Sequence, residues 1–132
     1  MANLQSLAEN VLDPAREAYR QPVYVSSGYR CPSLNKAVGG AVTSQHTRGE
    51  AADLCTGDGR QGNLRLAAVI DANRVYDQLI LEDTGRNDFA PAWVHVSCRR
   101  DTTLNRCQIL RKIAGERHYS VVTCENLQGC LN

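Results

Sequence analysis

The sequence predicts one α+β domain in which helices flank a largely antiparallel sheet. Its 132 residues, 42% of them hydrophobic, suit a single compact domain with a core of its own. Apolar residues recur at helical spacing near the N-terminus, and several later segments alternate as strands do. Because helices come first and are followed by strands interleaved with helices and by closing strands, an α+β arrangement is favoured.

Three parts of the chain have the pattern of helices. In the first, apolar residues recur at helical spacing on both sides of Asp13-Pro14, which is typical of a cap followed by proline at a first helical position. We therefore expect an opening pair of helices that ends before Gln21-Pro22. A short helix is expected over residues 33–38, stopped by Gly39-Gly40, and a longer one over residues 62–73.

Strand signals follow the same order along the chain. β-branched, aromatic or alternating segments predict strands at residues 23–27, 51–55, 77–82 and 92–98, and a hairpin formed by residues 107–113 and 118–124. No repeat or interdomain linker interrupts them. We therefore expect one domain over residues 1–124 and a C-terminal tail over residues 125–132.

Charge and hydropathy exclude two classes of partner. The formal net charge of +1, from 15 basic and 14 acidic residues, is too balanced for a nucleic-acid binder. No apolar run approaches the roughly 20 residues that a membrane span needs. The first eight residues lack the basic and apolar regions of a signal peptide, so we expect synthesis in the cytoplasm. The six cysteines leave open whether a disulfide forms, with Cys124 and Cys130 one candidate pair.

Two histidines and an aspartate have the character of a metal site. A turn at Gly49 can bring the His46 imidazole and the Asp53 carboxylate to one point, although a continuous strand would place them on opposite faces. In the strand 93–97, His95 points to the face that the flanking valines do not occupy. Isolated histidines on strands are also common as core residues. As metal ligands, two imidazoles and one carboxylate suit Zn²⁺ and leave a fourth position for water.

A zinc hydrolase also needs a general base for that water. Glu82 is the favoured candidate, because it is a polar end to the apolar strand 77–82 and this strand is expected beside that of His95. Asp83 and Asp88 are rivals in the following loop. Glu50 ranks lower, because its neighbours would turn it away from the metal.

Four motifs in order resemble the zinc D-alanyl-D-alanine carboxypeptidase family, which shares its fold with the hedgehog signalling domain. They are Ser27-Gly28-Tyr29-Arg30, residues 35–40 (NKAVGG), Ser44-x-His46-x-x-Gly49-x-Ala51-x-Asp53 and Trp93-x-His95-x-Ser97. The family also includes D-Ala-D-Ala dipeptidases and L-alanyl-D-glutamate endolysins of bacteriophages, and the resemblance covers about residues 4–113. Short members of the phage type are the most similar.

The resemblance implies a role for each matching residue. It makes His46, Asp53 and His95 the zinc ligands. It also implies that Arg30 binds the substrate's terminal carboxylate, or the carbonyl oxygen on which negative charge develops. Ser27 and Ser44 would support substrate binding, or they are ordinary turn and capping serines. Trp93 packs beside the ligands or in the core.

One departure from the family pattern concerns the general base. Dipeptidase-type members often carry the catalytic glutamate three residues before the final histidine, and that position is Ala92 in this chain. This departure leaves the identity of the general base open. It also leaves open a second class of function. That alternative is a non-catalytic zinc-binding or wall-binding module that has lost its base.

These expectations together predict a monomeric, phage-encoded zinc peptidase. It would hydrolyse D-Ala-D-Ala or another amide bond in the stem peptide of bacterial peptidoglycan, and it would act on the cell wall after release from the cytoplasm. A third possibility is a structural protein stapled by its cysteines.

Overall fold

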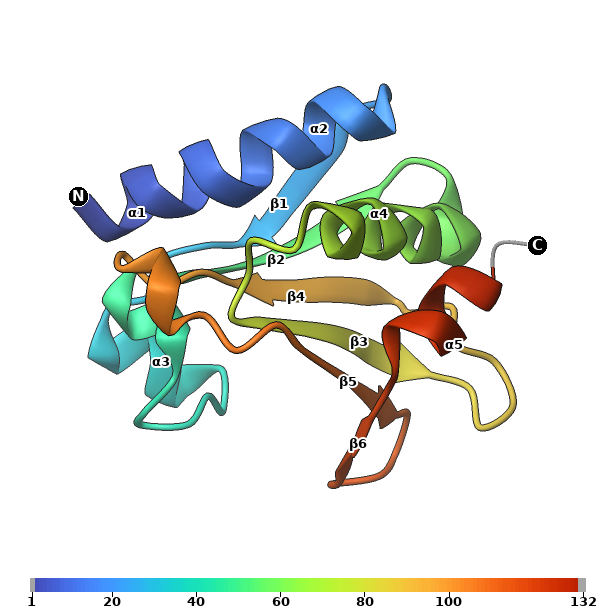
Figure 1. Ribbon diagram of the computed structural model, residues 1–132. Coiled ribbons are helices and arrows are strands. Elements are labelled where there is room, and N and C mark those ends of the chain that lie inside the picture. Colours follow the sequence, from blue (N-terminus) through green and yellow to red (C-terminus); the bar gives the residue numbers. More distant parts are fainter. Residues whose placement is uncertain (1, 131–132) are drawn as a thin grey trace.

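A six-stranded sheet organises residues 2–130, which the computed structural model describes (Figure 1). The strands are β1 (Val23–Ser27), β2 (Ala51–Thr56), β3 (Gln78–Thr84), β4 (Trp93–Ser97), β5 (Gln108–Ile113) and β6 (Tyr119–Val121). Their order across the sheet is β1-β2-β4-β3-β5-β6. Neighbours pair antiparallel except β3 and β5, which pair in parallel. The predicted α+β fold with a largely antiparallel sheet is confirmed.

The N-terminal helical segment differs from the expected pair of helices. α1 (Ala2–Leu7), the π-helical η1 (Ala8–Leu12) and α2 (Asp13–Tyr19) follow one another without a break (Figure 1). Asp13 has helical backbone angles, and Leu12 occupies the N-cap position of α2, so Asp13 is not the N-terminal cap that the sequence predicted. Pro14 lacks an N–H and would crowd the carbonyl one turn earlier, and the wider π turn just before it relieves that conflict. The helix ends at Arg20, which adopts a left-handed conformation.

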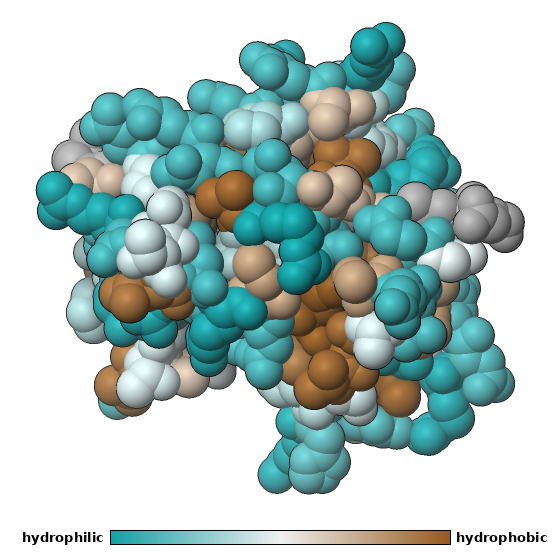
Figure 2. All heavy atoms as spheres, in the orientation of Figure 1, coloured by the Kyte–Doolittle hydropathy of each residue, from teal (hydrophilic) through white to brown (hydrophobic). Residues whose placement is uncertain are grey.

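The core lies between the sheet and the helices on one of its sides. α1, α2 and α4 (Gly59–Asn73) cover this side, whereas α3 (Pro32–Ala37) lies on the other (Figure 1). Alternation along the central strands directs Leu79 and Leu81 of β3 and Val94 and Val96 of β4 into the buried cluster. The intervening residues of β3 and β4 therefore face away from the helices. In Figure 2 an apolar area near β3 and β5 is surrounded by mostly hydrophilic side chains.

A short helix, α5 (Cys124–Gly129), covers most of the segment that we expected to be a C-terminal tail. Thr123 caps this helix by accepting a hydrogen bond from the Asn126 N–H at 3.0 Å. Leu127 is completely buried in the core, and Gln128 donates to the Ala68 carbonyl of α4 at 3.1 Å. One apolar residue in a short polar segment gives no detectable period, which is why the sequence pattern missed this helix.

Truncating Leu127 is expected to destabilise the protein. Leu127→Ala removes a buried side chain and leaves a cavity, so the free energy of unfolding should fall by about 2–5 kcal/mol. The matched control is Val121→Ala, whose side chain is 74% exposed, and its effect should stay within about 0.5 kcal/mol. Urea unfolding followed by circular dichroism measures both. Equal stability of the Leu127 variant and the wild type would show that α5 is not part of the folded core.

Two further sequence questions are answered within residues 2–130. The six cysteine thiols are all free, including those of Cys124, the first residue of α5, and Cys130, which follows its last residue. The helices in this part of the chain include none that is long and apolar enough to cross a membrane.

Candidate metal centre

The sheet register and one short turn bring His46, Asp53 and His95 together. Asp53 of β2 lies directly opposite His95 of β4, so both side chains project from the same face of the sheet. His46 comes from the 3-10 turn η2 (Gln45–Arg48), which ends at Gly49. Gly49 has a φ of 70°, a left-handed conformation that glycine adopts without strain, and there the chain reverses into β2.

The three side chains converge on a small volume. The Nε2 atom of His46 lies 3.2 Å from the Asp53 Oδ1 atom, and the Nδ1 atom of His95 lies 3.1 Å from the same oxygen. One ligand atom from each residue lies within 4.8 Å of the other two. The imidazole rings meet edge to face with centroids 5.1 Å apart. This is the convergence that the residue pattern around Gly49 and in the strand of His95 predicts.

The backbone fixes which nitrogen of His46 faces the cluster. Its Nδ1 lies 2.8 Å from the Gly28 carbonyl oxygen, which can only accept a hydrogen bond. Nδ1 therefore carries the proton, and Nε2 is the atom turned towards Asp53. A carbonyl that holds the distal nitrogen of a histidine is a common support for a metal ligand.

The spacing of the donor atoms fits a tetrahedral zinc site. Zinc–nitrogen and zinc–oxygen bonds of roughly 2.0–2.1 Å place neighbouring tetrahedral ligands about 3.3 Å apart. The two nitrogen–oxygen distances of 3.2 and 3.1 Å are close to that value. The donor set and its geometry are therefore compatible with a divalent cation.

The protonation state of Asp53 also suits a metal ligand. Burial raises the pKa of its carboxyl group, but hydrogen bonds and charge from His46 and His95 outweigh this effect and hold the pKa well below its usual range. Asp53 is therefore an anion at neutral pH.

Glu82 shares a cleft with this cluster. It lies opposite Trp93 in the register of β3 and β4, on the same face as His95. The cleft has a volume of about 660 Å³, and its lining includes the three clustered side chains together with Glu82 and Trp93. Burial, then repulsion from Asp53, raises the pKa of Glu82 to about 7. A carboxyl group of such pKa beside a cation site is suited to proton transfer near neutrality.

The other acidic residues of the sequence do not line the cleft. Asp83 follows Glu82 and has a φ of 54°, and its carbonyl accepts a hydrogen bond from Arg60. The Asp88 carboxylate accepts the Ala90 N–H at 2.9 Å within a turn. Glu50 pairs with Arg48 at 2.8 Å and lies outside the lining, as expected.

Arg30 and Ser44 line the cleft, whereas Ser27 does not. Nη2 of Arg30 donates to the Ser44 hydroxyl at 3.3 Å, and its Nε is buried without a hydrogen-bond partner among the described residues. Such a donor is available for an acceptor on a bound molecule. Ser44 caps η2 by accepting the His46 N–H at 3.2 Å, so it positions the turn that carries His46. Ser27 is at the end of β1 opposite Asp53.

The sequence reasoning missed part of the cleft wall. Lys112 of β5 and Tyr119 of β6, which lie opposite each other, line it, and so does Arg106. Alternation along β5 could have indicated that Leu110 and Lys112 share a face. It could not show that β5 pairs with β3 rather than with an edge strand.

The raised pKa of Glu82 makes a testable contribution to stability in the metal-free protein. The pKa rises from about 4.5 unfolded to about 7 folded, so this stabilisation is present below pH 4.5 and is lost as the pH rises through 7. At about 1.4 kcal/mol per pKa unit, the loss is on the order of 3 kcal/mol. Asp53 and Asp83 contribute to the shift, while Lys112 and His46 oppose it.

Urea unfolding at about pH 5 and about pH 8 tests this contribution. Between these two pH values, the free energy of unfolding should fall more for the wild type than for Glu82→Gln. Because both proteins keep the same histidines, the difference between the two losses is the contribution of the Glu82 carboxyl group. Parallel pH dependence of the two proteins would contradict the assignment of a raised pKa to Glu82.

The fold and the site together define a class of protein. Two imidazoles and a carboxylate beside a buried carboxyl group of raised pKa, in an open cleft, are the arrangement of a metal-dependent hydrolase. The sequence profile of the family described as Peptidase M15 matches residues 2–97, a range that includes His46, Asp53, Glu82 and His95. The chain belongs to the peptidase M15 family, which is zinc-dependent. A comparison with curated proteins found no match.

Proposed function

We propose that this protein is a zinc metallopeptidase that hydrolyses an amide bond in the stem peptide of bacterial peptidoglycan. Membership of the peptidase M15 family supports a peptidase. The observation that carries the proposal is the convergence of His46, Asp53 and His95 within 4.8 Å in the lining of a cleft. These residues would hold the ion.

The residues around the cluster supply the remaining needs of amide hydrolysis. When bound, zinc would provide Lewis acidity and lower the pKa of water in the site. Glu82, whose pKa is about 7, would take a proton from the attacking water and return it to the nitrogen of the leaving amine. Arg30 would bind the substrate's terminal carboxylate or the carbonyl oxygen, because its buried Nε lacks a partner among residues 2–130.

Cell-wall digestion tests the proposal directly. Purified peptidoglycan sacculi incubated with the zinc-loaded protein should release muropeptides, and mass spectrometry of these products identifies the bond that is cut. A chelator should stop the release and added zinc should restore it. If intact sacculi and isolated stem peptides both remain uncleaved by the zinc-loaded protein, the proposed activity is wrong.

A second candidate function is a zinc-binding or wall-binding module without activity. The alanine at position 92 favours it, because dipeptidase-type members often have a glutamate there. Ala92 donates its N–H to the Glu82 carbonyl oxygen at 2.9 Å, and Glu82 lines the cleft, so the neighbouring strand supplies a carboxyl group to the site. This arrangement favours the peptidase. A module of the second kind would bind sacculi and zinc and release nothing.

Three finer points belong to the same proposal. A phage origin, action on the wall after release from the cytoplasm and a monomeric state follow from the resemblance to short endolysins. Lysis assays on bacteria with permeabilised outer layers test the action on the wall, and sedimentation of the purified protein tests the monomeric state.

A further inference from the structure

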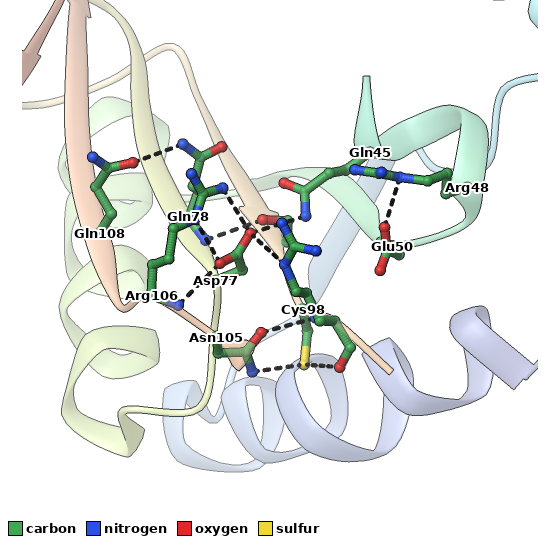
Figure 3. Close-up of polar contacts among 11 residues, drawn as sticks. Gln45, Arg48, Glu50, Asp77, Gln78, Cys98, Asn105, Arg106 and Gln108 are labelled. Carbon is green, nitrogen blue, oxygen red and sulfur yellow. Dashed lines mark hydrogen bonds and ion pairs between the residues drawn. The ribbon is translucent and has the colours of Figure 1, made fainter. Parts of the chain in front are cut away.

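A buried carboxylate, Asp77, orients an arginine at the edge of the cleft. Asp77 is completely buried and precedes β3. Arg106 donates to it through Nε, at 2.9 Å from Oδ1, and through Nη2, at 2.8 Å from Oδ2 (Figure 3). Gln45, the neighbour of His46, donates to Oδ2 at 3.0 Å. The two parallel bonds from Arg106 fix the plane of its guanidinium group.

The rest of that guanidinium group remains available. Nη1 of Arg106 has no hydrogen-bond partner among residues 2–130, and the Arg106 side chain as a whole is 50% exposed. Arg106 also lines the cleft that contains the metal cluster. A donor held rigidly from behind loses little conformational freedom when it binds an anion in front.

The charges around Arg106 leave this end of the cleft positive. The single charge of Asp77 faces two arginines, because Nε of Arg99 lies 3.6 Å from Oδ2 in addition to the contact with Arg106. Arg48, also in the cleft lining, is balanced by Glu50. Gln45 and Gln78, the nearby lining residues, are neutral.

The register places Arg106 away from the metal cluster along the sheet. Ile80 pairs with His95 on one side and with Leu110 on the other, and Gln78 pairs with Gln108. Arg106 precedes Gln108, so it lies beyond the level of Gln78. Two residues of a strand rise about 7 Å. An anion bound by Arg106 would therefore belong to a residue near the scissile amide and not to the amide itself.

Holding the chain in place does not require this arrangement of the Arg106 side chain. The main-chain N–H groups of this segment already bond to the two residues before β3, from Arg106 N to Asp77 Oδ1, from Cys107 N to Tyr76 O and from Gln108 N to Asp77 O. The two side-chain bonds from Arg106 to Asp77 therefore serve to orient the guanidinium group, because the main-chain N–H groups already hold the segment in place.

We propose that Arg106, oriented by Asp77, binds a carboxylate of the substrate and makes the enzyme selective for stem peptides in which that carboxylate is free. This inference rests on the proposed function. Two carboxylates of a stem peptide have the required chemistry, the one on the glutamyl residue and the one at the C-terminus. Amidation of either leaves the shape almost unchanged and removes the charge.

The test compares three peptides, namely the free acid, its glutamyl amide and its C-terminal amide. Hydrolysis is measured with the wild type, Arg106→Gln and the matched control Arg86→Gln, whose arginine is exposed and pairs with Glu116 outside the cleft. For the wild type, one of the two amidations should raise KM by about 10- to 100-fold, in line with a charged hydrogen bond. For Arg106→Gln, the KM for the free acid should be as high as the wild-type KM for the amide that matters. Amidation of that carboxylate should not raise the KM of Arg106→Gln further. Arg86→Gln should behave as the wild type.

Binding to the metal-free protein gives a second readout. Calorimetric titration should show that the free acid binds more tightly than the critical amide to the wild type, and equally tightly to Arg106→Gln. If Arg106→Gln fails to fold, the wild-type comparison still decides, because equal KM values for all three peptides would overturn the proposal. An equal loss on all three peptides in Arg106→Gln would assign Arg106 a structural role and also overturn it. If the wild type cleaves none of the peptides, the proposed peptidase function itself fails.

Discussion

Replacing His95 with alanine is expected to abolish zinc binding and hydrolysis together. His95 is one of three side chains whose donor atoms lie within 4.8 Å, and its removal leaves two ligands for the ion. A site of two ligands loses the ion and with it several kcal/mol of charge stabilisation in the transition state. This corresponds to a fall in activity of about 1000-fold or more. Metal content by elemental analysis and muropeptide release measure the two effects.

The third histidine provides a matched control for this experiment. His118 is exposed and lies outside the cleft lining, so His118→Ala should keep stoichiometric zinc and full activity. Circular dichroism of both variants without metal separates loss of the ligand from loss of the fold. Stoichiometric zinc in folded His95→Ala would show that the ion binds elsewhere in the protein.

Local patterns predicted that the side chains of the cluster could converge, and the resemblance to a known family assigned them as ligands. In β4, Val94 and Val96 are buried in the core while His95 faces the cleft, which is the alternation that the sequence suggested. The turn at Gly49 likewise follows from one residue with a left-handed backbone. Such features depend on only a few neighbouring residues, and elementary stereochemistry determines them.

Long-range pairing could not be predicted in the same way. The parallel pairing of β3 with β5 brings Lys112 and Tyr119 to the cleft, and no local period specifies that partner. The contact between Asp77 and Arg106 joins residues 29 positions apart and depends on the same pairing. The packing of Leu127 in α5 also depends on a distant helix, α4. The sequence therefore predicts which residues carry the chemistry better than it predicts the walls around them.

Glu82→Gln should leave the zinc site intact and remove most of the activity. Glutamine has nearly the same shape as glutamic acid, but its amide cannot accept a proton from water. Loss of a general base lowers rates by about 10²- to 10⁴-fold. Zinc content should be unchanged, because Glu82 is not one of the three clustered donors. Thermal stability of the zinc-loaded variant, measured beside activity, confirms that the loss is chemical.

The rival carboxylates are the controls for this variant. Asp83 and Asp88 are close to Glu82 in sequence and lie outside the cleft lining, so Asp83→Asn and Asp88→Asn should keep the activity of the wild type. Full activity of Glu82→Gln combined with a loss in either control would move the role of base to that aspartate. Since β3 directs Glu82 to the same face as His95, such a result would require the loop after β3 to rearrange when substrate binds.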